Sequence, residues 1–186
     1  MIKITSGKFK NRSLETIDKF VRPTSSLKRE AFFSILDSYV LKNSINLYKK
    51  KIFLDLFAGI GTMGLESISR GISKAIFYEN NNDVIRILKK NCNKLCKDDQ
   101  YSIIKEDIEN SRINEDFKNI SIIYMDPPYL KHDVNKILNI LQNKITKNSI
   151  IGVETSINDD FKIPNKLMLI NKKKYGKTKI SFLVLS

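Results

Sequence analysis

From Lys51 onward, short apolar segments alternate with segments of helical character, and this alternation limits the possible folds more than any other feature. In chain order, the apolar segments are 51–58, 75–79, 101–107, 120–126 and 149–155, and the helical segments among them are 61–70, 81–96 and 133–143. Strands that alternate with helices pack as a mostly parallel sheet joined by right-handed crossovers. The sequence therefore predicts an α/β fold.

The C-terminal part departs from this alternation. Two further β-like segments, 166–171 and 178–185, are joined by a basic turn around Gly176. Two strands joined in this way form a hairpin and run antiparallel. We therefore expect a Rossmann-like, mostly parallel seven-stranded sheet that ends in an antiparallel C-terminal hairpin, which is not the arrangement of a plain dinucleotide-dependent dehydrogenase.

Residues 1–50 precede this core. Residues 2–17 have the pattern of a small basic β-hairpin, and a helix is expected to begin near Thr24, Ser25 or Ser26. The apolar stripe expected along that helix consists of Leu27, Ala31 and Ile35, widened by Phe32 and Leu36. Because no flexible linker separates the two parts, we expect residues 1–50 to be an appendage of the same domain as the 51–186 core.

The chain carries a large positive charge. It has 33 basic and 20 acidic residues among 186, a formal net charge of +13. Such a charge attracts polyanions, so nucleic acid or an anionic membrane surface is the expected partner. No apolar run is long enough to span a bilayer, and the N-terminus lacks the apolar region of a signal peptide. We expect a soluble, cytoplasmic protein that acts as a monomer.

The cysteines do not indicate a metal site. Cys92 and Cys96 are four residues apart, and the chain has one histidine. Two thiols without further ligands make a poor zinc site, and disulfides are rare in a reducing cytoplasm. We expect two free thiols and no metal.

A glycine-rich turn follows the first apolar segment of the core. Gly59, Gly61 and Gly64 form G-x-G-x-x-G between a predicted strand and a predicted helix, the context of a nucleotide-binding turn. Glu79 ends the next strand twenty residues after Gly59, where a carboxylate can accept hydrogen bonds from both ribose hydroxyls of an adenosine cofactor. Asp107, at the end of the third strand, is placed to accept from an adenine amino group. This pattern alone does not separate NAD from S-adenosylmethionine.

A double proline ends the fourth core strand in I-Y-M-D-P-P-Y-L, residues 123–130. Proline fixes its own φ and holds the preceding residue extended, so the Asp126 carboxylate and the Pro127 carbonyl become two fixed acceptors. Two acceptors match the two hydrogens of a planar NH₂ group and make its nitrogen more nucleophilic. Tyr129 offers a face on which a heterocycle can stack. In this fold the fourth strand lies beside the first, so both motifs are expected in one cleft.

This acceptor pair distinguishes the two cofactors. A sulfonium methyl group is a strong electrophile, so a neutral amine can attack it and lose its proton afterwards. An NAD-dependent enzyme has no use for such a pair and needs a general acid near the nicotinamide. His132, the one histidine, is interpreted as a solvated residue of a loop or helix start. The pair therefore favours S-adenosylmethionine as the cofactor and S-adenosyl-L-homocysteine as its product.

The motifs together resemble a known family. F-A-G-I-G-T-M-G-L-E-S-I-S-R-G (57–71) and D-P-P-Y (126–129) are similar to class I S-adenosylmethionine-dependent methyltransferases that modify exocyclic amines. R-P-T-S-S-L-K-R-E-A-F-F-S-I-L (22–36) resembles, more specifically, the bacterial ribosomal RNA small-subunit methyltransferase D family, which methylates the N2 amine of one guanine in 16S rRNA. The similarity extends nearly from end to end. It implies 16S rRNA, or an assembling small-subunit particle, as the partner.

The resemblance also assigns roles to residues. The residues implied to hold the cofactor are Asp55, Gly59, Gly61, Glu79 and Asp107, with Thr24 in the Arg22-Pro23-Thr24 loop over the pocket. Those implied to hold the guanine amine are Asp126, Pro127 and Tyr129. Asn11 stands where the family pattern leads us to expect glycine, which leaves the course of the RNA-facing hairpin open.

More than one substrate class fits these residues. Those expected to contact RNA phosphates are Lys8, Lys10, Arg12, Arg22, Lys28, Arg29, Lys172, Lys173 and Lys174. A guanine in structured RNA would have to be flipped out to reach the cleft. A DNA or RNA adenine-N6 or cytosine-N4 methyltransferase uses the same four-residue motif. A protein-glutamine N-methyltransferase would act on a side-chain amide, which is also a planar NH₂ group, and a catalytically silent RNA-binding module would need only the basic surface.

Overall fold

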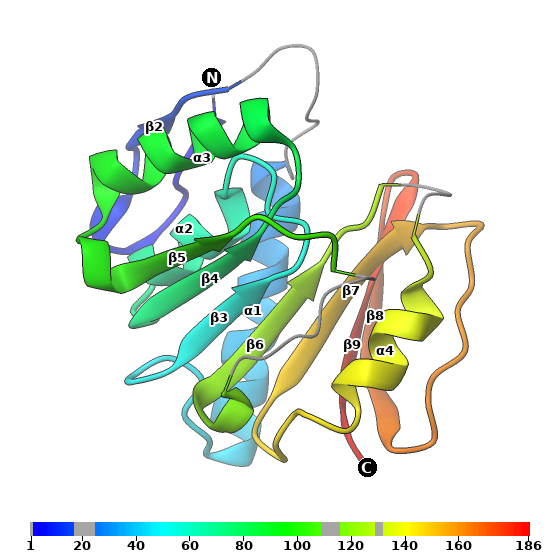
Figure 1. Cartoon of the computed structure of the whole chain (residues 1–186). Helices are drawn as coiled ribbons and strands as arrows, with labels where there is room; N and C mark the ends of the chain where they lie inside the picture. Colours follow the sequence, from blue (N-terminus) through cyan, green and yellow to red (C-terminus); the bar gives the residue numbers. More distant parts are fainter. Residues whose placement is uncertain (1, 17–24, 109–115, 129–131) are drawn as a thin grey trace.

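The computed structural model describes residues 2–16, 25–108, 116–128 and 132–186, and these residues form a sheet flanked by helices (Figure 1). The elements are β1 (Ile2–Lys3), β2 (Ser13–Leu14), α1 (Ser26–Asn43), β3 (Ile52–Asp55), α2 (Thr62–Ser69), β4 (Lys74–Tyr78), α3 (Asn82–Leu95), β5 (Tyr101–Ile104), β6 (Ile120–Met125), α4 (Val134–Leu141), β7 (Ile150–Ser156), β8 (Leu167–Tyr175) and β9 (Thr178–Leu185). Three short 3₁₀ helices, η1 (Gly7–Phe9), η2 (Asp98–Gln100) and η3 (Phe117–Asn119), complete the set. Each strand and helix expected from Lys51 onward is present.

The main sheet has seven strands in the order β5-β4-β3-β6-β7-β9-β8. The pairs from β5 to β7 are parallel, and β9 is antiparallel to both β7 and β8. This confirms the predicted mostly parallel sheet with an antiparallel C-terminal hairpin. The strand order reverses between β3 and β6, so the topological switch point lies where the glycine turn and the double proline leave the sheet.

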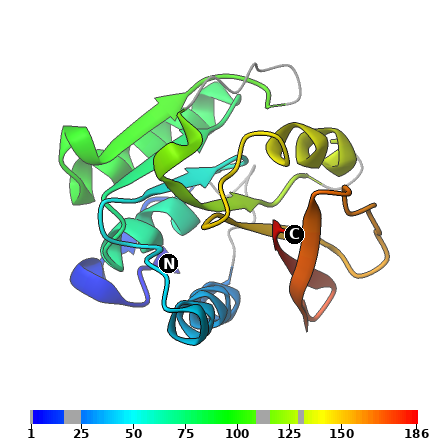
Figure 2. The same cartoon turned by 90° about the horizontal axis from the view of Figure 1, so that it is seen from below.

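Two apolar layers cover the sheet. Large buried side chains of α1, α2 and α3 pack on one face with Phe53, Phe77 and Phe182, whereas α4 packs on the other face with Ile123 and Ile151. Figure 2 shows α1 and α4 on opposite sides of the sheet. β3, β6 and β7 are therefore covered on both faces, which explains why their sequences are continuous apolar runs.

The face that α1 buries differs in part from the predicted one. The buried side chains of α1 are Arg29, Phe32, Phe33 and Leu36. Leu27 is 68% exposed, and Ala31 and Ile35 are not among the fully buried core residues. The Phe32 ring packs against Tyr124 and Phe182 with centroids 5.2 and 5.3 Å away, and burial of two aromatic rings outweighs burial of the smaller stripe. Of the predicted stripe, Phe32 and Leu36 are confirmed as buried, Ala31 and Ile35 are half-buried, and Leu27 is wrong. The helix begins as expected, with Ser25 as its N-cap.

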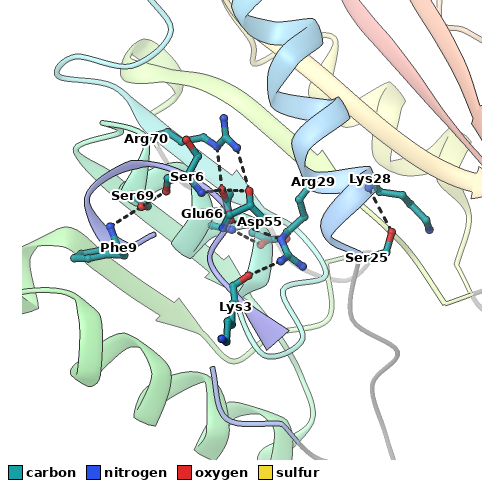
Figure 3. Close-up of polar contacts among 12 residues, drawn as sticks. Lys3, Ser6, Phe9, Ser25, Lys28, Arg29, Asp55, Glu66, Ser69 and Arg70 are labelled. Carbon is teal, nitrogen blue, oxygen red and sulfur yellow. Dashed lines mark hydrogen bonds and ion pairs between the residues drawn. The ribbon is translucent and has the colours of Figure 1, made fainter. Parts of the chain in front are cut away.

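The N-terminal hairpin, β1 paired antiparallel with β2, is fastened to the core through the buried Glu66 of α2. The Glu66 carboxylate accepts the N–H of Thr5 at 2.9 Å, the Thr5 hydroxyl at 2.7 Å and the N–H of Ser6 at 3.0 Å. Arg70 donates to the same carboxylate at 3.1 Å, and the Arg29 guanidinium lies 3.7 Å from it (Figure 3). One buried side chain thus joins the hairpin, α1 and α2.

A second anchor holds the segment that follows β2. Asn91 of α3 is fully buried, accepts the N–H of Glu15 at 2.8 Å and donates to the Glu15 carbonyl at 3.1 Å. The same amide donates to the carbonyl of Ile60, inside the glycine turn, at 3.1 Å. Asn11 has φ of +68°, in the region that glycine adopts most readily, which explains the expectation of a glycine there. The division of the chain at residue 50 stays a prediction.

Candidate active site

The carboxyl ends of β3, β4, β6 and β7 border one cleft of about 1170 Å³. Its lining includes Asp55 and Gly59 from the glycine turn, Glu79 after β4, and Asp126 and Pro127 after β6. Because β3 and β6 are adjacent parallel strands, the two motifs open on the same edge of the sheet. The structure thus brings together the described residues of the predicted cofactor and amine sites in one cavity, with Gly61 as the exception.

Gly61 shapes the turn without lining the cleft. Its N–H donates to the Ala58 carbonyl at 2.8 Å, its φ is +86°, and it is the N-cap of α2. A Cβ at this position would lie 2.5 Å from Cδ1 of Leu88 in α3. Glycine is therefore required by the turn and by α3. Gly61 is not among the residues that line the cleft, and its contact with the cofactor stays a prediction.

Glu79 holds the other end of the turn. Its carboxylate accepts the N–H of Gly59 at 3.0 Å, that of Asn80 at 3.0 Å and that of Asn81 at 2.9 Å. The two carboxylate oxygens offer about four lone-pair positions, so capacity remains for a hydroxyl in the cleft. Asp107 also lines the cleft, but it follows β5 by three residues and does not end the strand as predicted.

Asp55 lies deep in the cleft and is 1% exposed. Its carboxylate accepts the N–H of Gly64 at 3.2 Å, which ties the end of β3 to the first turn of α2. The pKa of Asp55 is raised to about 8, chiefly by burial; the Gly64 hydrogen bond lowers it, and the charges of Asp126 and Glu79 raise it. This pKa favours the protonated form of Asp55 at neutral pH.

Asp126 follows the last residue of β6 and is half-buried, with Pro127 buried behind it. Burial raises the pKa of Asp126 to about 7, the charge of Glu154 raises it as well, and the charge of Lys28 lowers it. Asp126 thus changes its charge near neutral pH. Tyr129, the third residue predicted to hold the amine, lies outside the described residues.

Two residues beside Asp126 were missed or misassigned by the sequence interpretation. Glu154, in the second half of β7, is 1% exposed and accepts the hydroxyl of Tyr124 at 2.7 Å. The ammonium group of Lys28 is paired with the other oxygen of Glu154. The signal in the sequence was a single glutamate at the end of the apolar run I-I-G-V-E-T. Lys28, predicted to contact phosphate, instead lies at the edge of the cleft with its charge turned toward the sheet.

His132 lies just before α4, in agreement with its interpretation as a helix-start residue, but it is not fully solvated. It is half-buried, lines the cleft, and its ring centroid lies 4.8 Å from that of Phe57. The helix that follows begins at Val134 with Asp133 as its N-cap. His132 therefore belongs to the wall of the cleft beside the glycine turn.

The predicted RNA-contacting residues fall into different environments. Those whose side chains are exposed are Lys8, Lys10, Arg12, Lys172, Lys173 and Lys174. Arg29 is 2% exposed, donates to the Lys3 carbonyl at 2.6 Å and lies beside Glu66, so the prediction that it contacts phosphate is wrong (Figure 3). The reason is that α1 turns this side of the helix toward the N-terminal hairpin. Arg22, Pro23 and Thr24 lie outside the described residues.

Both cysteines are free thiols, as predicted, and burial raises the pKa of Cys92 and of Cys96. Within the described ranges, no group of three or more histidine, cysteine and acidic side chains is placed to hold a metal ion. None of the helices described here has both the length and the apolar character needed to cross a membrane.

Comparison with known proteins gives consistent matches over nearly the whole chain. Residues 2–184 match the family described as conserved hypothetical protein 95. Ribosomal RNA small subunit methyltransferase D of Buchnera aphidicola subsp. Acyrthosiphon pisum is 34% identical over 92% of this chain and 87% of its own. The structure named "Putative methyltransferase yhhF" from Escherichia coli superposes with a TM-score of 0.82 at 23% identity, over 100% of this chain and 98% of its own. An RNA methyltransferase from Salinibacter ruber, in complex with S-adenosyl-L-homocysteine, has a TM-score of 0.64 at 13% identity, over 88% of this chain and 94% of its own.

Proposed function

The chain belongs to the conserved hypothetical protein 95 family, and from this premise we propose that it is an S-adenosylmethionine-dependent methyltransferase of small-subunit ribosomal RNA. The name of the Buchnera relative, ribosomal RNA small subunit methyltransferase D, supports the reaction and the substrate class. The observation that carries the proposal is the single cleft shared by the glycine turn and the Asp126-Pro127 segment. We further propose that the methylated group is the N2 amine of one guanine in 16S rRNA.

The residues of the cleft fit the cofactor. Glu79 keeps acceptor capacity for ribose hydroxyls, and Asp107 lies farther along the same edge as an acceptor for the adenine amino group. Ile108 and Val84 line the cavity with apolar surface suited to the adenine ring. Asp55 and Gly59 would face the methionine and sugar parts. When bound, the sulfonium supplies an electrophilic methyl group.

The amine end of the cleft is built from acceptors. The Asp126 carboxylate and the Pro127 carbonyl would each accept one hydrogen of the guanine N2 amine. The extended backbone before each proline holds both acceptors in place. Accepting both hydrogens draws the nitrogen lone pair out of the ring conjugation and raises the nucleophilicity of the nitrogen, and an ionised Asp126 takes up the proton that is released. Tyr129 would stack on the guanine ring.

The RNA would approach over basic surface. Lys8, Lys10 and Arg12 are exposed on the N-terminal hairpin, and Lys172 to Lys174 are exposed on β8. With a net charge of +13, such residues neutralise phosphates without reading bases. We propose that residues 1–50 face the RNA, that Arg22 and Thr24 belong to a loop over the cofactor, and that the protein acts in the cytoplasm as a monomer on free 16S rRNA or an assembling particle.

The direct test is transfer of tritiated methyl from S-adenosylmethionine to three substrates: naked 16S rRNA, small ribosomal subunits that lack the modification, and duplex DNA. Digestion to nucleosides identifies the methylated base. We expect N2-methylguanosine from one of the RNA substrates and no methyl in DNA. Methyladenine, methylcytosine, or methyl incorporated into DNA alone would contradict the proposal and favour an adenine-N6 or cytosine-N4 methyltransferase.

A further inference from the structure

Two charged residues at the amine end of the cleft do not belong to the acceptor pair of Asp126 and Pro127. Lys28 comes from the first turn of α1, which is fixed by its N-cap because Ser25 accepts the Lys28 N–H at 3.3 Å (Figure 3). Glu154 comes from the second half of β7. Their side chains form an ion pair in which Lys28 is 20% exposed and Glu154 is 1% exposed. The Tyr124 hydroxyl holds the second oxygen of Glu154 at 2.7 Å.

This pair lies next to Asp126. In the parallel pairing of β6 with β7, Met125 is opposite Val153, so Asp126 and Glu154 are the next two positions along the same edge. Adjacent strands are separated by about 4.8 Å. Tyr124, two residues before Asp126, bonds to Glu154 directly. Lys28, Asp126 and Glu154 all line the cleft.

We propose that Lys28 and Glu154 form a charge pair that controls the ionisation of Asp126, with Lys28 as a positioning residue that balances Glu154. This inference rests on the proposed function only for the role of Asp126 as the acceptor of the amine proton. The pair also ties the first turn of α1, and hence the N-terminal extension, to the edge of the sheet that carries Asp126.

The physical reason is the cost of placing two carboxylates side by side in a half-buried cleft. Two such groups disfavour the second charge, and burial disfavours both charges. A protonated Asp126 could not accept the proton that the nitrogen releases after methylation. The ammonium of Lys28 compensates the charge of Glu154, so Asp126 can ionise near neutral pH, in agreement with the opposite effects of Glu154 and Lys28 on its pKa.

Other ionisable groups face the same space and remain in place when Lys28 or Glu154 is replaced. Asp55 reaches it from β3, Tyr124 from β6, His132 from the segment before α4, and Lys177 from the turn between β8 and β9. Asp55 and Asp126 interact electrostatically. These groups are the same in all the variants below. A difference in the ionisation of Asp126 between the variants therefore comes from the change of Lys28 or Glu154.

The test compares the pH dependence of kcat/KM for methyl transfer by wild type, Lys28→Met, Glu154→Gln and the double variant. The pH dependence of kcat/KM reports the pKa values of the essential acid and base groups of the free enzyme. A neighbouring charge moves a carboxyl pKa by roughly one to three units. We expect the acidic limb of this pH profile to move to higher pH by roughly one unit in Lys28→Met and to move to lower pH in Glu154→Gln. In the double variant the limb should return toward its wild-type position.

Two control variants separate charge from structure. Lys28→Arg keeps the charge and is expected to leave the limb near its wild-type position. Lys42→Met removes an exposed lysine from the last turn of the same helix and is expected to have no effect. If the acidic limb of the profile does not move in Lys28→Met and RNA binding becomes weaker instead, the inference is wrong. Lys28 would then be a residue that contacts RNA phosphates, as the sequence predicted.

A second readout does not require activity. Carboxyl-detected NMR of ¹³C-labelled protein follows the titration of Asp126 in wild type and in Lys28→Met, the variant expected to fold because its side chain is partly exposed. The Asp126 titration midpoint should rise in Lys28→Met. If wild type methylates no rRNA while this midpoint rises, the proposed function fails and the charge pair stands. If the midpoint is unchanged, the charge pair is wrong whatever the substrate.

Discussion

The carboxylate of Glu79 accepts a 3.0 Å hydrogen bond from the backbone N–H of Gly59, twenty residues earlier in the chain. The acidic end of β4 thus fixes the first glycine of the turn that ends β3. Glu79 also caps the N–H groups of Asn80 and Asn81. The residue proposed to bind ribose therefore shapes the surface on which the cofactor would lie.

Replacement of Glu79 by alanine is expected to weaken S-adenosylmethionine binding. The variant loses the ribose acceptor and frees the Gly59 N–H. Hydrogen bonds to a charged group contribute about 1.5–3 kcal/mol, equivalent to a loss of affinity of roughly ten- to a hundredfold. Isothermal titration calorimetry measures this change. Asn80→Ala, which alters a neighbouring side chain but keeps its backbone N–H, is the matched control, and unchanged affinity in Glu79→Ala would remove the ribose assignment.

Replacement of Asp126 by alanine is expected to abolish methyl transfer while cofactor affinity changes little. Asp126 lies after β6, at the amine end of the cleft, whereas Glu79 and Asp107 follow β4 and β5, farther along the sheet. Loss of a proton acceptor lowers a rate by roughly 10²–10⁴-fold. Single-turnover transfer of labelled methyl to rRNA, together with calorimetry on the same preparation, separates the two effects. Transfer at the wild-type rate would show that Asp126 is not part of the chemistry.

The sequence was sufficient for the sheet and for the convergence of the two motifs. Alternating apolar and helical segments specify a parallel sheet, and the carboxyl ends of adjacent parallel strands meet at one edge. The pairing of Lys28 with Glu154 joins residues 126 positions apart and depends on how α1 crosses the sheet. The angle at which α1 crosses the sheet cannot be predicted from the periodicity of apolar residues in the sequence. For the same reason the sequence included Leu27 in the buried face of α1 and missed Phe33, although Phe32 and Leu36 are buried as predicted.

Replacement of Gly152 by alanine is expected to destabilise the fold by about 1–3 kcal/mol, the usual cost of overpacking a core. A Cβ at Gly152 of β7 would lie 2.4 Å from Cε2 of Phe32. The Phe32 ring is fully buried and contacts the rings of Tyr124 and Phe182, so a shift of Phe32 would disturb these contacts. Urea unfolding measures the loss. If Phe32→Leu is combined with Gly152→Ala, the double variant should lose less stability than the sum of the two single changes, and strict additivity would contradict the clash.

Replacement of Glu66 by alanine is expected to release the N-terminal hairpin. The variant leaves the buried Arg29 guanidinium without its carboxylate partner and the N–H groups of Thr5 and Ser6 without their acceptor. Removal of one member of a buried ion pair costs about 3–5 kcal/mol. Hydrogen exchange should become faster in residues 2–16 than in β3 and β6. Equal acceleration in all three regions would mean that Glu66 supports the whole core and not the hairpin in particular.

Replacement of Asp55 by asparagine is expected to change how stability depends on pH. In the folded protein burial raises the pKa of Asp55 from 3.8 to about 8. Between these values the unfolded chain has lost the proton and the folded chain keeps it. The stability contributed by the protonated form is therefore complete below about pH 4 and is lost as the pH rises through about 8.

Asparagine does not titrate and retains an oxygen for the Gly64 N–H, which lies 3.2 Å from the Asp55 carboxylate. Any constant effect of the substitution is the same at both pH values. The raised pKa of Asp126 acts in the same direction in both proteins, and the comparison therefore reports Asp55 together with its interaction with Asp126. Urea unfolding at about pH 5 and about pH 8 should show the difference in unfolding free energy, variant minus wild type, increasing by more than about 1.4 kcal/mol, the equivalent of one pKa unit. A difference that is constant with pH would mean that Asp55 is already ionised in the folded protein at the lower pH.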